Sequence, residues 1–412
     1  MDNLRISNAK ALLQKLAINI PKFLPSEERL LFIHKEIIGQ LSESERTIFR
    51  EFLDGCLKEM RELSASDIDM GGWGSNRRIW LRIHGAKKPM EQYGVFEVFE
   101  FDILILSILT DNQRETLLSQ RNLDISYHFQ GSDGKYYRQR ANVHLELGAL
   151  ALNMRAISEK IFSYQAYGFH PNVTKVLSLV HTKEGLILVT GITGSGKSTT
   201  LDAIVDLNNQ SIDAHIIIIA SPVEFVHRSQ RCIIRHREVG RDTQSFKQGT
   251  IEALRQDPDI IVIGEMRDPE TIMSALEVAD SGHKVLSTLH TSSAIESIDR
   301  IIGEVPSEEQ DRVRNRLADV LRCVISQKLV PSKDGKRILA KEIMLMAPNI
   351  RSAIKNNNTS EIYQMMRDGL KNGMTTLEQD LKNLVEMNRI TPETAMDFAN
   401  NKRMLQQLMQ GY

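Results

Sequence analysis

The segment from Gly191 to Ser198 constrains this chain more than any other part of it. It reads Gly-Ile-Thr-Gly-Ser-Gly-Lys-Ser, a complete GxxxxGK[ST] motif, after the apolar run Leu186 to Thr190 and before a segment compatible with a helix. A strand, a glycine-rich loop and a helix N-terminus in this order let several backbone N–H groups bind the same phosphate oxygens. A chance glycine-rich turn would not have both flanking elements. We therefore expect a P-loop inside an α/β domain.

The motif assigns a role to each of its residue types. The glycines let the loop wrap closely around phosphate groups, and Lys197 reaches the β- and γ-phosphates. Ser198 is the expected Mg²⁺ ligand. ATP and Mg²⁺ are therefore the predicted ligands, and the predicted binding loop consists of Gly191, Thr193, Gly194, Ser195, Gly196, Lys197, Ser198 and Thr199.

From Gly185 onwards, continuous apolar runs alternate with segments that have a helical pattern. Runs that are buried on both faces and separated by helices are typical of a parallel α/β sheet. Here they are Leu186 to Val189, Ile216 to Ile219, Ile260 to Ile263 and Val285 to Leu289. A 3.6-residue spacing of apolar residues from Val313 to Leu329 predicts a further helix, and weaker amphipathic segments continue to Tyr412.

Two of these predicted strands end in polar residues, at the sheet edge where ligands bind in open α/β folds. Glu265 follows the run that ends at Ile263 and is the candidate to orient or deprotonate the attacking water. A solvated glutamate at a strand end is the alternative. His290 follows Leu289 and could sense the γ-phosphate, although a histidine taken alone is as often structural.

Composition bounds the class of protein and its surroundings. The 412 residues suffice for two or three domains, and 41% hydrophobic with 25% charged residues is the balance of a soluble globular protein. The formal net charge of −1 gives no reason to expect a nucleic-acid partner. No apolar run approaches the ~20 residues of a membrane span, so we expect a cytoplasmic protein. The three cysteines lie far apart, which supports neither a disulfide framework nor a zinc site.

The N-terminal part differs in pattern from the rest. A capping box, Ser42-x-x-Glu45, precedes apolar residues at helical spacing, and short alternating runs broken by glycines follow from Ser64 to Ile157. These patterns predict an α/β protein in five segments: a helical extension at 1–60, an α+β domain at 61–165, a linker at 166–184, the P-loop domain at 185–345 and a helical region at 346–412.

Four blocks of sequence point to a known family. They are Gly185 to Thr200, Arg237 to Thr243, Ala253 to Asp268 and Ser281 to Ala294. These blocks resemble the Walker A motif, the segment after the acidic box, the Walker B motif and the histidine box of the PilT branch of the type II/type IV secretion ATPase superfamily. The resemblance implies a RecA-like P-loop ATPase core, an N-terminal PAS-like α+β domain and helical N- and C-terminal segments.

In that family ATP lies between the two domains, and arginines of the N-terminal domain approach its phosphates. By position these are Arg140 and Arg155, although either could be an ordinary surface cation. A cation there would stabilise the charge that develops on the transferred γ-phosphoryl group. The resemblance also implies a homohexamer, since arginines supplied by a neighbour require repeating subunits. The implied partner is an inner-membrane pilus platform protein, which would keep the chain peripheral at the inner membrane.

The acidic box departs from the family pattern. Members read roughly I-E-D-P-I-E-F, whereas this chain reads Ile-Ala-Ser-Pro-Val-Glu-Phe from Ile219 to Phe225. Ala220 and Ser221 replace two carboxylates that normally lie near the metal and its waters, and Glu224 is retained as a candidate catalytic residue. We expect nucleotide binding to persist and hydrolysis to be slow.

The resemblance favours a motor for pilus retraction, because Pro348 to Ile354 is similar to the retraction motif of the family. Assembly and secretion ATPases typically add a tetracysteine zinc module, for which this chain lacks the cysteines. Three alternatives stay open: a type IVB secretion ATPase of the DotB kind, a type II secretion ATPase, and a PilU-like accessory subunit that shares the work with an active paralogous ATPase. The last would be a nucleotide-binding ring subunit with little turnover.

Overall fold

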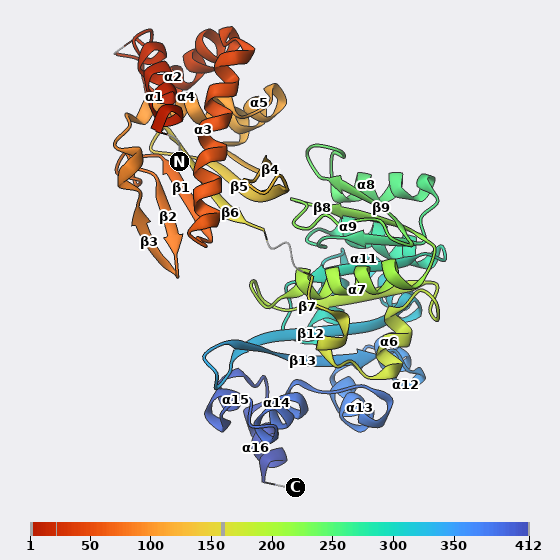
Figure 1. The fold of residues 1–412 in the computed structure, drawn as a ribbon. Coiled ribbons are helices and arrows are strands. Elements are labelled where there is room, and N and C mark those ends of the chain that lie inside the picture. Colours follow the sequence, from red (N-terminus) through yellow and green to blue (C-terminus); the bar gives the residue numbers. More distant parts are fainter. Residues whose placement is uncertain (1–2, 22, 158–160, 411–412) are drawn as a thin grey trace. The chain divides into compact units, whose positions relative to one another are not determined.

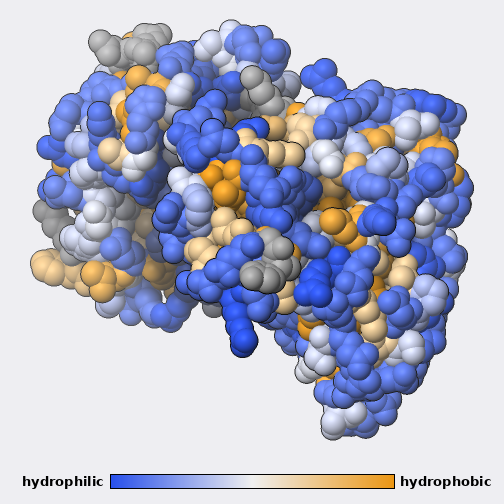
Figure 2. Space-filling view, turned by 90° about the horizontal axis from the view of Figure 1, so that it is seen from below, coloured by the Kyte–Doolittle hydropathy of each residue, from blue (hydrophilic) through white to orange (hydrophobic). Residues whose placement is uncertain are grey.

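The computed structural model describes residues 3–21, 23–157 and 161–410. The chain divides into two compact units, Met1–Glu159 and Lys160–Tyr412 (Figure 1). Each unit has its own sheet and its own hydrophobic core. No helix among the described residues is both long and apolar enough to span a membrane. In the face seen in Figure 2, hydrophilic side chains cover most of the surface, and apolar side chains form small separate groups.

The first unit combines helices with a six-stranded antiparallel sheet in the order β3-β2-β1-β6-β5-β4. Its helices are α1 (Asn3–Ala17), α2 (Ser26–Phe32), α3 (Glu43–Glu62), α4 (Val98–Ser107) and α5 (Asp111–Gln120), with a π-helical turn at Ile33–Ile37 and 3-10 turns at Ile38–Gln40 and Glu91–Tyr93. Its strands are β1 (Asp67–Gly71), β2 (Trp80–Ile83), β3 (Ala86–Pro89), β4 (Asn122–Gln130), β5 (Tyr136–Glu146) and β6 (Ala149–Ala156).

One hydrophobic core joins the N-terminal helices to this sheet. Leu13 of α1 and Phe49 of α3 are buried in the same cluster as Ile68 of β1 and Met154 of β6. The capping box predicted at the start of α3 is confirmed, since Ser42 and the N3 glutamate hydrogen-bond each other's backbone N–H groups. The helical segment 1–60 is therefore packed against the α+β part, and both belong to one compact unit.

The second unit contains a seven-stranded sheet in the order β13-β12-β7-β11-β10-β8-β9, parallel throughout except for the β12–β13 pair. Its strands are β7 (Gly185–Thr190), β8 (His215–Ala220), β9 (Ile233–Glu238), β10 (Ile260–Ile263), β11 (Lys284–Leu289), β12 (Leu321–Pro331) and β13 (Arg337–Leu345). The four predicted apolar strands are confirmed, as is the α/β class with a P-loop core.

Helices cover this sheet on both faces, with α7 in front of it and α9 and α11 behind it in Figure 1. The helices are α6 (Pro171–Leu177), α7 (Lys197–Ser211), α8 (Phe246–Ala253), α9 (Pro269–Asp280), α10 (Ala294–Gly303), α11 (Ser307–Val320), α12 (Pro348–Lys355), α13 (Ile362–Asp368), α14 (Leu377–Glu386), α15 (Pro392–Phe398) and α16 (Lys402–Met409). Turns of 3-10 helix lie at Tyr164–Tyr167, Leu254–Gln256, Thr359–Glu361 and Leu370–Asn372.

Two expectations about this unit differ from the structure. The helix predicted from Val313 to Leu329 is wrong beyond Val320, because residues 321–331 form β12, which pairs with β7 and β13. An apolar run buried on both faces matches helical spacing by chance, and pairing to two strands decides the outcome. The range 166–184, expected as a linker, contains α6, and Leu177 and Leu179 are buried in the core of the second unit.

The C-terminal helices divide between two clusters. Ile350 of α12 and Ile362 of α13 belong to the main core of the unit. Helices α14, α15 and α16 form a separate small core with β12 and β13, built from Val330, Ala340, Leu377, Leu381, Leu384, Ile390, Ala395 and Leu405. These last helices therefore pack against β12, which is a neighbour of the P-loop strand β7, and against the edge strand β13.

Candidate nucleotide-binding site

The loops that carry the predicted site residues of the second unit start at one edge of its sheet. β7, β11, β10 and β8 are parallel, and Thr190 of β7 lies beside Leu289 of β11, while Ile263 of β10 lies beside Ile219 of β8. The loops after these strands therefore meet at the carboxyl edge, where ligands bind in open α/β sheets.

The glycine-rich loop has the backbone geometry that close contact with phosphate requires. Gly191, Gly194 and Gly196 have φ values of +146°, +80° and +91°, a region that favours glycine. A Cβ on Gly191 would lie 2.4 Å from the carbonyl oxygen of Gln327, so a larger residue would displace the backbone there. Gly196 is the N-cap of α7 and leads the loop directly into the positive end of the helix.

The hydroxyl groups of the loop differ in exposure. Ser195 is buried, and its Oγ has no hydrogen-bond partner among the described residues. Thr193 and Ser198 are exposed, and Thr199 is half-buried in the first turn of α7. An unpaired buried hydroxyl and accessible hydroxyls beside a helix N-terminus fit a ligand rich in acceptor oxygens, as MgATP is.

Lys197 lies over the loop and near two carboxylates. Its Nζ donates hydrogen bonds to the carbonyl oxygens of Gly191, at 2.8 Å, and Ile192, at 3.2 Å. Burial lowers the pKa of Lys197, and the negative charges of Glu265 and Glu224 oppose that shift. The structure thus brings together the lysine and both glutamates that the sequence predicted for the site.

Glu265 lies between a cation and the predicted histidine. Its Oε2 is 2.8 Å from Nε of Arg267 and 3.8 Å from Nε2 of His290. Burial, followed by the charge of Lys197, lowers the pKa of His290, so the imidazole is neutral near pH 7. A neutral imidazole has one N–H, which can donate a hydrogen bond to an acceptor oxygen.

The altered acidic box lies next to the loop of Glu265. Gly264 donates its N–H to the carbonyl oxygen of Ile219 at 2.8 Å, and a Cβ on Gly264 would lie 3.3 Å from Cα of Ala220. Ala220 is half-buried and Ser221 is exposed. Ala220 is therefore adjacent to the loop that carries the candidate water-activating glutamate.

Two residues that contact the predicted site residues were not predicted from the sequence. Gln327 of β12 is buried, donates to the carbonyl oxygen of Ser195 at 2.9 Å and accepts from Oγ1 of Thr200 at 3.0 Å. Arg267 is the other, through its ion pair with Glu265. The sequence signals for these two residues were weak. Gln327 is a polar residue inside an apolar run, and Arg267 is an arginine inside the block that resembles the Walker B motif.

Arg140 and Arg155 belong to the first unit, where they lie in one row across the open face of the sheet. Directly paired residues of β3, β2, β1, β6 and β5 form this row: Lys87, Arg82, Asp67, Arg155 and Arg140. We call these five residues the cation row. It carries four cations and a single carboxylate.

Asp67 organises the centre of the cation row. It is buried, and its carboxylate lies 2.7 Å from Nε of Arg155 and 3.4 Å from Nε of Arg82. Burial alone would raise the pKa of Asp67, but hydrogen bonds from Ser66 and Arg155 outweigh burial and hold the pKa below its ordinary value. Because Asp67 binds Arg155 through Nε, the exposed guanidinium keeps a fixed direction.

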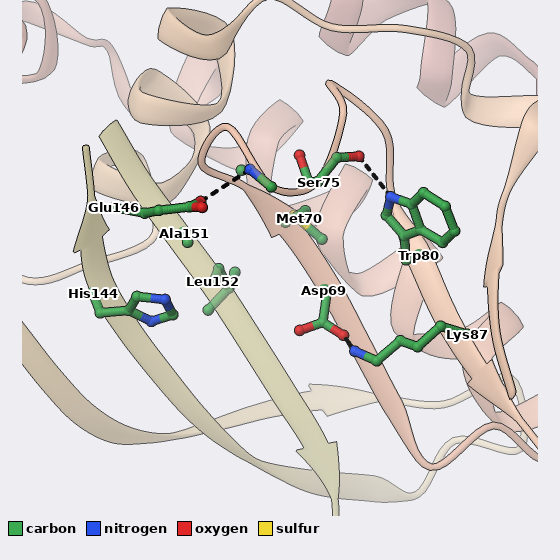
Figure 3. A pocket seen from close by; sticks show the side chains of 11 residues that line it. Asp69, Met70, Ser75, Trp80, Lys87, His144, Glu146, Ala151 and Leu152 are labelled. Carbon is green, nitrogen blue, oxygen red and sulfur yellow. Dashed lines mark hydrogen bonds and ion pairs between the residues drawn. The ribbon is translucent and has the colours of Figure 1, made fainter. Parts of the chain in front are cut away.

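A pocket of about 430 Å³ lies on the same unit and shares Lys87 with the cation row (Figure 3). Trp80 and the loop at Ser75 line one side of it, and Glu146 and His144 line the other. Lys87 pairs with Asp69, Glu146 accepts from the N–H of Gly74, and Trp80 donates to the carbonyl oxygen of Ser75. The charged groups of the pocket are thus paired with groups of the unit itself.

A mainly parallel sheet with a P-loop after an inner strand, and with a glutamate and a histidine at the same edge, defines a P-loop ATPase. The family model described as "Type II/IV secretion system protein" matches residues 42–395. The chain belongs to this family and is an ATPase that binds ATP.

Several curated relatives match most of the chain. It is 40% identical over 296 residues to the type IV pilus retraction ATPase PilT of Pseudomonas aeruginosa, covering 72% of this chain and 84% of that protein. It is 36% identical over 324 residues to a twitching motility protein of Neisseria gonorrhoeae, covering 78% and 84%. It is 33% identical over 305 residues to the type IV pilus ATPase PilU of P. aeruginosa, covering 73% and 78%.

Two solved structures are similar in fold as well as in sequence. The crystal structure of the pilus retraction motor PilT with bound ADP has a TM-score of 0.76 and 36% identity, covering 86% of this chain and 98% of that chain. The X-ray structure of the Legionella pneumophila ATPase DotB has a TM-score of 0.66 and 29% identity, covering 84% and 94%.

Proposed function

We propose that this chain is an ATP-hydrolysing hexameric motor for type IV pilus retraction in twitching motility. The observation that carries the proposal is the constellation of Lys197, Glu265 and His290 at one sheet edge, in a chain 36–40% identical to retraction and twitching motility proteins. Because those relatives and this chain match over most of their lengths, a shared function is the simplest interpretation.

In the proposed mechanism the loop residues bind the triphosphate and Glu265 orients or deprotonates the attacking water, with Glu224 beside it. Lys197 binds the β- and γ-phosphates, Ser198 is the protein ligand of Mg²⁺, and His290 contacts the γ-phosphate. Mg²⁺ supplies charge neutralisation for the phosphate oxygens. The accessible Ser198 hydroxyl on the first turn of α7 suits a metal that keeps most of its waters.

Arg140 and Arg155 are the proposed cations of the first unit that stabilise the transition state. Arg155 is exposed and oriented by Asp67, and Arg140 lies directly opposite it on β5. Preoriented cations cost no reorganisation at the moment when charge develops on the γ-phosphoryl group. If they come from a neighbouring subunit, the homohexamer is itself the catalytic unit.

The proposed partner is a pilus platform protein of the inner membrane, which would place this chain in the cytoplasm at the membrane's inner side. Arg351 is exposed on α12, in the segment that resembles the retraction motif, and is available to transmit motion. No nucleic-acid partner is proposed, since the formal net charge is −1.

Two other functions have an observation in their favour. The Ala220–Ser221 pair favours a low-turnover accessory subunit, as does the similarity to PilU, and such a subunit would work beside an active paralogous ATPase. The likeness to DotB favours a type IVB secretion ATPase.

The test is genetic and uses the organism that encodes the chain. Deleting the gene should abolish twitching and leave more pili on the surface, since extension continues without retraction. Arg351→Ala should reproduce the loss of twitching while the purified protein keeps its ATPase rate, and Lys371→Ala, also exposed, serves as the control. Normal twitching in the deletion strain together with a secretion defect would transfer the assignment to the secretion ATPases.

A further inference from the structure

The loop after β11, which starts at His290 and ends at Ser293, is held in place by the C-terminal end of the chain. We propose that the turn Phe398–Asn401, through Asn400, positions this loop beside Glu265 and thereby sets the rate of ATP hydrolysis. Asn400 is a positioning residue in this proposal, which rests on the proposed role of His290 and Glu265. All the contacts involved lie within the second unit.

Asn400 joins the loop to β12 with both ends of its amide. Its Nδ2 donates to the carbonyl oxygen of Ser292 at 3.2 Å, and its Oδ1 accepts from Nζ of Lys328 at 2.7 Å. Lys328 also donates to the carbonyl oxygen of Phe398 at 2.9 Å, so the turn itself is fixed to the strand. Both Nδ2 and Oδ1 are therefore satisfied, and the amide has one defined orientation.

A buried carboxylate anchors the other side of the turn. Glu378 of α14 is fully buried, and its Oε1 accepts from the backbone N–H of Asn401 at 2.8 Å. Its Oε2 accepts from the hydroxyl of Tyr363 at 2.8 Å. A buried carboxylate is costly unless it is hydrogen-bonded, so the turn and the carboxylate stabilise each other.

A second carboxylate holds the end of the same loop. Glu342 of β13 is buried, and its Oε1 accepts from the N–H of Ala294 at 2.7 Å, at the N-terminus of α10. Burial raises the pKa of Glu342 to about 7. The carbonyl of Ser292 and the N–H of Ala294 are thus both fixed by side chains from the C-terminal half of the unit.

These contacts reach the reacting centre through a short piece of chain. Ser292 is two residues from His290, whose Nε2 lies 3.8 Å from Oε2 of Glu265. A displacement of the loop would change that distance, and misplacement of a catalytic group by about 1 Å can cost as much as ~100-fold in rate. At the start of α10, Ser293 accepts from the N–H of Glu296, and Oε2 of Glu296 accepts from the N–H of Ser292 at 2.7 Å. These contacts fix the N–H of Ser292, whereas Asn400 binds its carbonyl oxygen, so the Asn400 contact is additional to the cap of the helix.

In this proposal Asn400 affects the position of the loop and not the stability of the fold. Asn400 is exposed, and an exposed hydrogen bond contributes little to the free energy of unfolding. Removing it should leave the fold intact while the loop gains freedom.

The test uses the full chain with Asn400→Ala and Asn400→Asp. The aspartate keeps the oxygen that faces Lys328 and loses the N–H that binds Ser292, so it isolates the contact with the loop. We expect both variants to lower kcat by roughly 2- to 30-fold, the range of couplings carried by such networks. KM for ATP should stay unchanged because the phosphate loop is not touched, and Tm should equal that of the unaltered protein.

Asn383→Ala is the matched control, since Asn383 is exposed on α14, which packs in the same small core. Hydrogen exchange of residues 290–294 is a second readout that needs no turnover, and it should be faster in both Asn400 variants. Unchanged exchange and unchanged kcat would overturn the proposal. A protein without any hydrolysis would overturn the proposed function instead, while the exchange measurement would still decide the role of Asn400.

Discussion

By the resemblance described in the sequence analysis, Ala220 and Ser221 replace two carboxylates of the acidic box. The structure puts Ala220 next to the loop of Glu265. Mg²⁺ in a phosphate site keeps several waters, and carboxylates outside its first coordination sphere hold those waters. Their loss loosens the metal and the attacking water without removing the phosphate loop. We therefore expect this chain to bind MgATP and to turn it over slowly.

Restoring the pair as Ala220→Glu with Ser221→Asp should raise kcat, by roughly 10- to 100-fold if each carboxylate acts as such outer groups usually do. Affinity for nucleotide should change little, because Lys197 and the glycine-rich loop are unaltered. Steady-state ATPase assays and equilibrium binding of a fluorescent ATP analogue measure the two quantities. Glu265→Gln in both backgrounds is the control for background hydrolysis. A double variant no faster than the unaltered protein would contradict the view that the box limits this enzyme.

A different single residue, Lys284 of β11, makes stability depend on pH. It is fully buried, and its Nζ donates to the carbonyl oxygens of Val176, at 2.7 Å, and Thr182, at 2.9 Å. Burial lowers the pKa of Lys284 from 10.5 to about 7. Between these values the unfolded chain binds a proton that the folded chain does not, so this group adds stability as the pH rises from about 7 towards 10.

Lys284→Met removes that dependence. Relative to the variant, the free energy of unfolding of the unaltered protein should rise across this window, with a slope of at most ~1.4 kcal/mol per pH unit. Urea unfolding of both proteins at several pH values from about 6 to 9 measures the difference. A difference that stays constant over this range would show that Lys284 keeps one protonation state throughout.

Among the elements, the parallel strands and the P-loop were predictable because their signals are local in sequence. Each strand is a continuous apolar run, and the P-loop is a glycine-rich motif directly after one of these runs. β12 was not predictable, since its spacing matches a helix until pairing with β7 is known. The hydrogen bond from Gln327 to the carbonyl oxygen of Ser195 depends on the same strand pairing, so no local sequence pattern predicts it. The ion pair of Arg267 with Glu265 likewise follows from the tertiary fold.

The proposed role of the cation row can be tested by substitutions of Arg155 and Asp67. Arg155→Ala should lower kcat more than it weakens nucleotide binding, because a cation that meets developing charge acts mainly in the transition state. Asp67→Asn should move kcat in the same direction by a smaller factor, since it frees Arg155 without removing the guanidinium. Arg121→Ala, an exposed arginine outside the row, is the control. If neither variant changes kcat, another basic residue meets the phosphates.

For the whole molecule, we propose that the phosphate loop of the second compact unit and the cation row of the first act in the same reaction. When a site is shared between subunits, a closed ring completes every copy of it, whereas a monomer completes none. Light scattering with MgATP at micromolar concentration should therefore show a hexamer-sized particle. A strict monomer under all nucleotide conditions would count heavily against a motor.

Mixing two inactive variants decides whether the arginines act within a chain or between neighbours. Lys197→Ala has an intact cation row and a defective loop, and Arg155→Ala has the reverse. If the row of one subunit serves the loop of the next, mixed rings contain some sites with a normal loop and a normal row, so activity should return on mixing. If each chain serves its own loop, every site keeps one defect and the mixture should stay as slow as its components. Recovery that grows with the fraction of mixed rings is the outcome we expect, and its absence from rings proven to be mixed would place the arginines in the same chain as the nucleotide.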